Sequence, residues 1–199
     1  LLNCAFLGLL RTQEICVTAG CAGFGQGLFV VFGLFSLAIA AIFIIGQTDF
    51  KRMLAYSSVE HIGILALGVG LAGQGVSGAM FHAVNHSLTK GCLFLLAGNI
   101  LSVYGTKSIR DVRGLLRVTP VSGLLWILGF LAITGSPPFG SFLSEFVILK
   151  SAFAQGHILV GVLYLVLLSA IFVGMASSFL AMAQGPASQP AVRVESREP

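Results

Sequence analysis

The stretch "GSPPFGSFLSEFVILKSAF", residues 135–153, places two adjacent prolines in an apolar region that runs from about residue 119 to about residue 152. This region is longer than the roughly 20 residues that a straight helix needs to cross a bilayer. Pro137 and Pro138 remove two backbone donors, and a proline disfavours helical geometry in the residue before it. The stretch therefore predicts a discontinuous membrane helix. Such breaks need surrounding protein or a water-filled cavity, and they often mark ion sites in transporters.

The composition of the chain indicates an all-α, polytopic membrane protein. Of 199 residues, 56% are hydrophobic and 9% are charged, whereas soluble domains usually carry about 25% charged residues. Continuous apolar runs predict helical spans at about residues 27–46, 54–72, 78–103 and 157–182, in addition to the broken helix. The net charge of +4 comes largely from short loops between these spans, so it does not indicate nucleic-acid binding.

The first ten residues, "LLNCAFLGLL", are apolar but too few to cross a bilayer. They lack the basic segment and cleavage site of a signal peptide, so we expect the chain to begin within a helix of a longer protein. A glycine-rich loop is expected between Glu14 and residue 27. The prediction is thus about six transmembrane helices, the first one partial, in one domain over residues 1–182. The polar tail, residues 183–199, is expected to be disordered.

Basic residues gather in a few polar segments. Alternating crossings place the loops at residues 47–53 and 104–118 and the C-terminal tail on one side, with Arg11 and Lys150 on the other. The first side carries Lys51, Arg52, Lys107, Arg110, Arg113, Arg117, Arg193 and Arg197. This asymmetry predicts that these loops and the tail face the cytoplasm. It requires the broken helix to cross once, whereas the alternative, a surface loop between two short helices, would disturb the alternation.

Three ionisable residues occur at intervals of four in "FHAVNHSLTKGCLFLLAG", residues 81–98: His82, His86 and Lys90. A charge at bilayer depth costs about 2.5–3.5 kcal/mol or more, so we expect each to have a function. On a helix, each step of four rises about 6 Å and turns about 40°. Adjacent members are then within reach of one or two waters. Since histidine can accept a proton on one nitrogen and donate from the other, the stripe favours a proton relay.

Two other interpretations of this stripe remain open. His82 and His86 could share a metal ion, although the metalloprotease pattern needs Glu directly after the first His, where this chain has Ala83. Each histidine could also be an ordinary core residue with a satisfied hydrogen bond. The sequence contains no haem, flavin or iron–sulfur pattern. We therefore expect no metal and no redox cofactor in this chain.

Two further groups of ionisable residues lie in the apolar runs. Glu145 follows the two prolines by seven residues and is expected near the middle of the membrane. It could instead pair with Lys150, although a separation of five lies off the ideal contact face of a helix. Glu60 and His61 lie early in their span. They are either the cytoplasmic entrance of a proton path or side chains that extend to the interface.

Three ordered motifs resemble a known family. "QTDFKRMLAYSSVEHIGILALG", residues 47–68, is similar to a stretch of the antiporter-like membrane subunits of respiratory complex I. This superfamily includes subunits of multisubunit Na⁺/H⁺ antiporters and of membrane-bound group 4 hydrogenases. "FHAVNHSLTKGCLFLLAG" resembles the family's H-x3-H-x3-K stretch, and "SPPFGSFLSEFVILKSAF" resembles its discontinuous helix. "AYSSVEHIG" is most similar to the hydrogenase-4 component F branch.

The resemblance implies roles for individual residues. Family members have two inverted five-helix repeats, and this chain resembles the second repeat and the helix before it. By position, His82, His86 and Lys90 resemble the central proton relay, and Glu145 resembles the ionisable residue of the broken helix. Asn3 stands where several branches have a Lys or His that links the two half-channels, so the usual link is changed here.

The function implied by the resemblance is a proton-translocating membrane subunit of a hydrogenase-4 or NADH–quinone oxidoreductase type of complex. It would lie in a bacterial or archaeal cytoplasmic membrane with other membrane subunits. Iron–sulfur, NiFe or quinone chemistry is expected only in partner subunits. The alternatives are a cation/proton antiporter subunit without a redox partner, and a scaffold bundle in which the ionisable residues only hold helices together.

Overall fold

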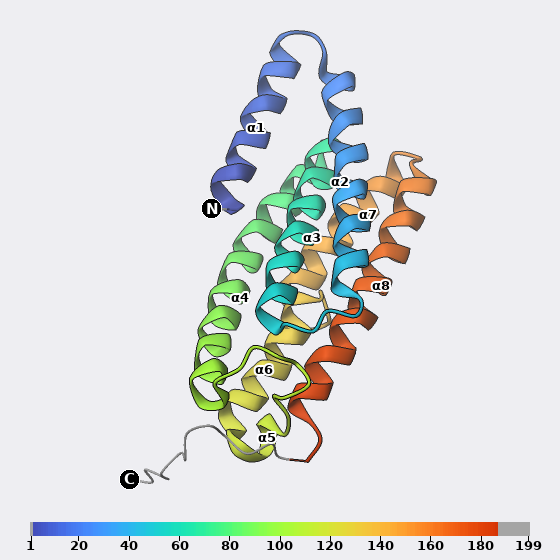
Figure 1. Cartoon of the computed structure of the whole chain (residues 1–199). Coiled ribbons are helices and arrows are strands. Elements are labelled where there is room, and N and C mark those ends of the chain that lie inside the picture. The colour runs from blue at the N-terminus through green and yellow to red at the C-terminus, as the bar shows by residue number, and fades with distance from the viewer. Residues whose placement is uncertain (1, 187–199) are drawn as a thin grey trace.

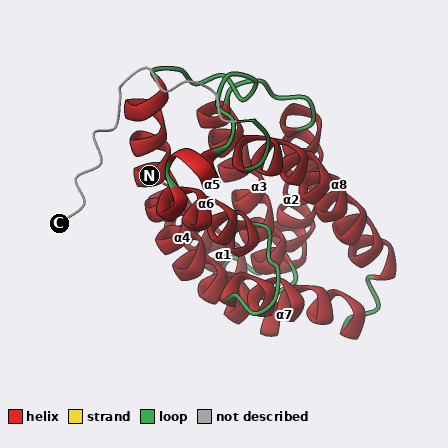
Figure 2. Cartoon of the chain, turned by 90° about the horizontal axis from the view of Figure 1, so that it is seen from below, coloured by secondary structure: helices red, strands yellow, loops and turns green. Residues whose placement is uncertain are grey.

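This computed structural model describes residues 2–186 of the chain. The regular elements in this part are helices, and no strand occurs among these residues (Figure 2). They are α1 (Leu2–Thr18), α2 (Ala22–Ile44), α3 (Phe50–Gly70), α4 (Gln74–Tyr104), α5 (Leu115–Val118), α6 (Pro120–Ile133), α7 (Gly140–Ala154) and α8 (Ile158–Ala183). The tail that was expected to be disordered lies outside the described residues from residue 187 onward.

Four of these helices are long and apolar enough to cross a membrane: α2, α3, α4 and α8, with 23, 21, 31 and 26 residues. Helix α6 has 14 residues and α7 has 15, and they follow each other across Pro137 and Pro138. Together they make one discontinuous crossing. With α1, of 17 residues, the architecture is the predicted all-α membrane bundle with one broken helix.

The predicted glycine-rich loop after Glu14 is wrong in extent, because α1 continues to Thr18 and α2 already begins at Ala22. The reason is helix packing. A Cβ on Gly25 would lie only 2.5 Å from the Gln13 side-chain oxygen and 3.1 Å from Cys16 Cβ. The glycine thus lets α1 and α2 approach closely, and this contact outweighs the low helix propensity of glycine.

Helix α3 lies at the centre of the bundle. In the most apolar 18-residue stretch of α3, 72% of the residues are buried, against 28% in the corresponding stretches of α2, α4 and α8. Helix α2 crosses it at backbone contact, because a Cβ on Gly33 would lie 2.9 Å from the carbonyl oxygen of Gly63. Side chains in the middle of α3 are therefore enclosed by other helices rather than by lipid.

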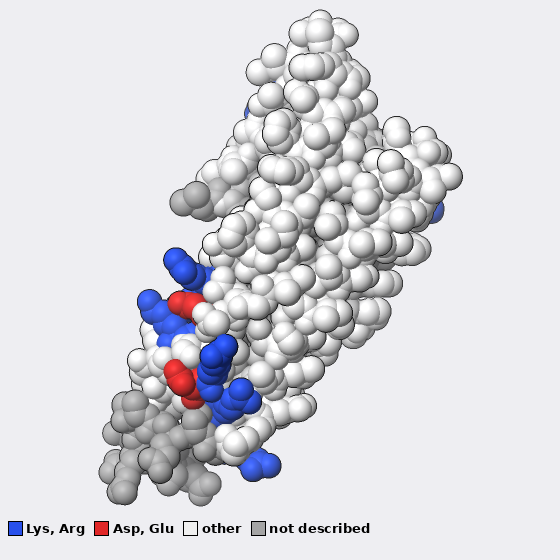
Figure 3. All heavy atoms as spheres, turned by 45° about the vertical axis from the view of Figure 1, so that its right-hand side comes forward, with Lys and Arg blue, Asp and Glu red and all other residues white. Residues whose placement is uncertain are grey.

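The basic loops meet at one end of the bundle (Figure 1). The amide of Phe50 donates to Lys107 O at 3.1 Å, and the amide of Ile109 donates to Thr48 O at 2.8 Å. The amide of Gly114 donates at 3.4 Å to Gln184 O, which lies just after the end of α8. Charged side chains cluster at this end of the face seen in Figure 3, while the rest of that face is almost uncharged. The turns before α2, α4 and α8 lie at the other end (Figure 1).

Helix α3 starts from this basic end with a side-chain cap. The Asp49 carboxylate accepts from the amides of Lys51 and Arg52 at 2.8 and 3.1 Å. Two of the amides left without partners at the start of a helix are thereby satisfied. The cap fixes where α3 enters the membrane, and so fixes the depth of the side chains that follow it.

Candidate functional site

Three histidines from two helices lie against one another inside the bundle. His61 of α3 and His82 of α4 are fully buried, and His86 of α4 is 3% exposed. His61 Nδ1 lies 2.8 Å from His82 Nε2, and the ring centroids of His61 and His86 are 4.1 Å apart. The His82 and His86 centroids are 6.4 Å apart. The His61 ring therefore connects the two histidines of α4.

Hydrogen bonds give this cluster a direction. Ser144 Oγ of α7 donates its proton to Ser141 O at 2.7 Å, so it accepts from His82 Nδ1, which lies 2.9 Å away. His82 Nε2 is then the acceptor of the bond from His61 Nδ1. His61 Nε2 is left as a buried acceptor with no hydrogen-bond partner. The chain of bonds thus runs from the centre of the bundle to the helix that carries Glu145.

Lys90 lies one turn beyond His86 on α4 and is 7% exposed. Its ammonium donates to Ser57 Oγ at 2.6 Å and to the carbonyl oxygen of Leu54, both on α3. Glu60, also on α3, is 3% exposed, and one of its carboxylate oxygens has no hydrogen-bond partner. These contacts make α3 a polar partner of α4 along the whole stripe.

Glu145 is 8% exposed and lies on α7 just after the break. The irregular link, residues 134–139, contains Gly135 at φ +62° and a cis peptide bond between Pro137 and Pro138. A Cβ built on Gly135 would overlap the Glu145 carboxylate. Lys150, the alternative partner of Glu145, is exposed. The break thus leaves room for a buried carboxylate.

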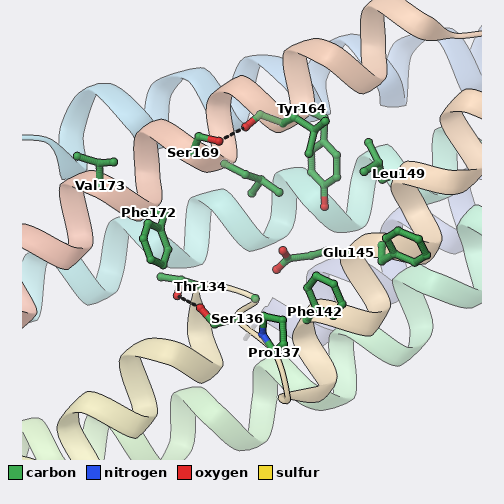
Figure 4. A pocket seen from close by; sticks show the side chains of 14 residues that line it. Thr134, Ser136, Pro137, Phe142, Glu145, Leu149, Tyr164, Ser169, Phe172 and Val173 are labelled. Carbon is green, nitrogen blue, oxygen red and sulfur yellow. Dashed lines mark hydrogen bonds between the residues drawn. The ribbon is translucent and has the colours of Figure 1, made fainter.

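Two pockets reach the two ends of this cluster. One, of about 370 Å³, lies between the break, α7 and α8, and Glu145 and Tyr164 are in its wall (Figure 4). The other, of about 270 Å³, is lined by residues of α1, α3 and α4 that include His86 and Lys90. In the second pocket the Asn3 amide donates to Ser87 Oγ at 2.9 Å. Each end of the cluster is therefore next to a space large enough for water.

Residues 1–172 match the family described as NADH:quinone oxidoreductase/Mrp antiporter, transmembrane. The chain belongs to this family. The hydrogenase-4 component F homolog of Methylacidiphilum infernorum is 39% identical over 173 residues, which cover 86% of this chain and 36% of the relative. A Na(+)/H(+) antiporter subunit of Alkalihalophilus pseudofirmus is 27% identical over 161 residues, covering 80% and 31%. The chain thus spans about a third of the length of these curated relatives.

Solved structures agree with the membership in the NADH:quinone oxidoreductase/Mrp antiporter family. A chain of respiratory complex I from Thermus thermophilus superposes with a TM-score of 0.78 at 27% identity, covering 88% of this chain and 38% of that chain. A chain of the Mrp complex from Dietzia sp. gives 0.76 at 23% identity, covering 81% and 30%, and shows the fold alone. The predicted resemblance to antiporter-like membrane subunits is confirmed.

Within this family fold, the structure brings most of the predicted site residues together. His82, His86 and Lys90 are buried on α4, and His82 bonds Ser144, the residue that precedes Glu145 on α7. Glu60 and His61, predicted as a path entrance or as side chains that extend to the interface, are both buried, so the second interpretation is wrong. They lie inside because α3 is the central helix, which periodicity alone does not reveal.

Three polar residues of the site were not singled out from the sequence. Ser144 could have been found because it is next to Glu145, and Ser57 because it lies two helical turns after the Asp49 cap. Tyr164 had no signal, because it stands alone in the apolar run of α8. Only the packing of α8 against the break places it beside Glu145 (Figure 4).

Proposed function

We propose that this protein is a proton-translocating membrane subunit of a multisubunit complex. The observation that carries the proposal is the connection from Lys90 and His86, through His61 and His82, to Ser144 beside Glu145. The five ionisable groups in this connection would not be buried together in a bundle of this size without a function. A pocket at each end gives water access to the connection.

The direction of the hydrogen bonds suggests how a proton moves. A proton that arrives from Lys90 or His86 binds His61 Nε2, the acceptor without a partner. His61 then releases its Nδ1 proton to His82 Nε2, and His82 releases its own Nδ1 proton toward Ser144. The Ser144 hydroxyl would accept this proton, turn away from Ser141 O and release its own proton to a water beside the Glu145 carboxylate. Each imidazole thus accepts on one nitrogen and donates from the other, and a ring rotation restores the starting state.

The energy for this movement would come from redox chemistry in partner subunits. The relative named as a hydrogenase-4 component F homolog, at 39% identity, supports this over an antiporter without a redox partner, whose named relative is 27% identical. Iron–sulfur, NiFe or quinone sites would then lie in the other subunits. The basic end of the bundle would face the cytoplasm of a bacterial or archaeal cell.

The test is Lys90→Ala in the complete protein, assembled with its partner subunits in membrane vesicles. Proton pumping should fall by about 100-fold or more, the factor that a positioned proton-transfer group typically contributes. Assembly of the complex should survive. Lys150→Ala removes an exposed lysine and is the matched control, which should pump normally. Normal pumping in Lys90→Ala would contradict the relay and favour a scaffold role.

A further inference from the structure

The hydroxyl of Tyr164 has no hydrogen-bond partner although it is buried. The side chain lies on α8 and is 1% exposed. A buried hydroxyl without a partner is unfavourable, since its desolvation is not compensated. Figure 4 shows the ring extending across the pocket at the break, with the hydroxyl directed toward the Glu145 carboxylate. A phenylalanine would fill the same volume without this cost, so the hydroxyl itself requires an explanation.

The pocket between Tyr164 and the break can hold the missing partner. Its volume of about 370 Å³ is many times the roughly 30 Å³ that one water occupies in the liquid. Its polar groups come from three elements: Thr134 and Ser136 of the break, Glu145 of α7 and Tyr164 of α8. Thr134 Oγ1 donates to Phe130 O at 2.8 Å, so it can only accept in its 3.4 Å contact with Ser136 Oγ. The Ser136 oxygen can still accept from water.

The rest of the pocket wall is apolar and includes Phe142, Leu149 and Phe172 (Figure 4). Water in this pocket is therefore held by the few polar groups alone. A water needs two to four polar partners to be ordered in a buried site. Ser136 and Glu145 supply two partners around this space, and the Tyr164 hydroxyl, which is closed to water in this conformation, becomes the third when its ring turns slightly toward the pocket.

We propose that Tyr164 is a positioning residue for Glu145, acting through a pocket water that Ser136 also binds. This inference rests on the proposed role of Glu145 as the last group of the relay. When Glu145 releases its proton, a pocket water accepts it and becomes hydronium, and a carboxylate remains. Tyr164 keeps its own proton throughout and donates, through the bound water, to that carboxylate. A hydrogen bond to the charged form favours it, so the hydroxyl assists the release.

The experiment is Tyr164→Phe in the complete protein within its assembled complex. The first measurement is the infrared C=O band of protonated Glu145, identified as the band that disappears in Glu145→Gln. Loss of the water-mediated hydrogen bond should shift this band to higher wavenumber. The second measurement is proton pumping, which should fall about 10-fold, as expected when one hydrogen bond to a charged group is removed.

Tyr56→Phe is the matched control, because it removes a hydroxyl from a ring of α3 that stacks on Phe43 at 5.0 Å and does not line the pocket. Its band and pumping should be unchanged. Ser136→Ala is the second variant, and it should also shift the band because it removes another partner of the water.

The outcomes separate the two proposals. An unshifted Glu145 band in both Tyr164→Phe and Ser136→Ala overturns the positioning role, whatever happens to pumping. Normal pumping in Glu145→Gln overturns the relay role of Glu145, which is the proposed function rather than the hydroxyl contact. If Tyr164→Phe does not assemble, the band of Ser136→Ala decides.

Discussion

The imidazole of His61 stands between those of His82 and His86, with Nδ1 at 2.8 Å from one ring and its centroid at 4.1 Å from the other. Along α4 alone, the two rings are 6.4 Å apart between centroids, so transfer between them would need a mobile water. His61 shortens that gap, because its Nδ1 bonds His82 and its ring lies against His86, although its Nε2 makes no hydrogen bond. The proposed proton path would therefore leave α4, cross to α3 and return, rather than follow one helix face.

His61→Gln tests this crossing. Glutamine keeps one donor and one acceptor at similar volume, but it does not titrate, so packing should survive while proton transfer fails. We expect pumping in vesicles to fall by about 100-fold or more. His157→Gln, at an exposed turn before α8, is the control and should pump normally. A His61→Gln protein that pumps at the wild-type rate would rule out transfer through α3.

At the residue scale, the sequence predicted what depends on one helix and missed what depends on two. The spacing of four placed His82, His86 and Lys90 on one stripe, and all three are buried on α4. The contact of His61 with His82 depends on how α3 packs against α4, which no periodicity encodes. For the same reason the sequence left open whether Glu60 extends to the interface, and the central position of α3 encloses it instead.

At the element scale, the break between α6 and α7 does more than shorten two helices. Pro137 and Pro138 predicted where the helix stops, because they remove donors and restrict the backbone. They did not predict the backbone of Gly135, whose φ of +62° brings it against the Glu145 carboxylate. That arrangement depends on the path of the returning helix, and it determines how closely the carboxylate approaches the link.

Gly135→Ala tests whether that close approach matters. An alanine in this left-handed conformation costs about 1–2 kcal/mol, and its Cβ would also displace Glu145. We expect a lower Tm in detergent and a loss of proton pumping. Gly156→Ala is the matched control, because Gly156 has φ +78° and a Cβ there would meet nothing within 4 Å.

The two variants separate backbone strain from the position of the carboxylate. Both should lose stability from the left-handed conformation, but only Gly135→Ala should lose pumping. Equal pumping in the two proteins would mean that Glu145 tolerates displacement, and would argue against a function that depends on its position.

At the scale of the whole molecule, the distribution of basic residues agrees with the path of the chain through the bundle. The loops that hold Lys51 and Lys107 are joined by backbone hydrogen bonds at one end, as the alternation of basic segments predicted. This part of the fold was predictable because loop charge is set by the membrane rather than by tertiary packing. The agreement depends on α6 and α7 together making a single crossing, so the number of crossings and the orientation can be tested together.

Cysteine labelling makes that test. With Cys4, Cys16, Cys21 and Cys92, which are free thiols, changed to Ser, single cysteines are introduced as Lys107→Cys and His157→Cys. Both positions are exposed, and the segments that hold them, the link from α4 to α5 and the turn before α8, lie at opposite ends of the bundle (Figure 1). An impermeant maleimide should label Lys107→Cys only in inside-out vesicles, because basic loops stay in the cytoplasm. It should label His157→Cys only in intact cells or right-side-out vesicles, because one broken helix lies between them. The opposite pattern would reverse the orientation, and labelling of both from one side would show that α6 and α7 do not cross together.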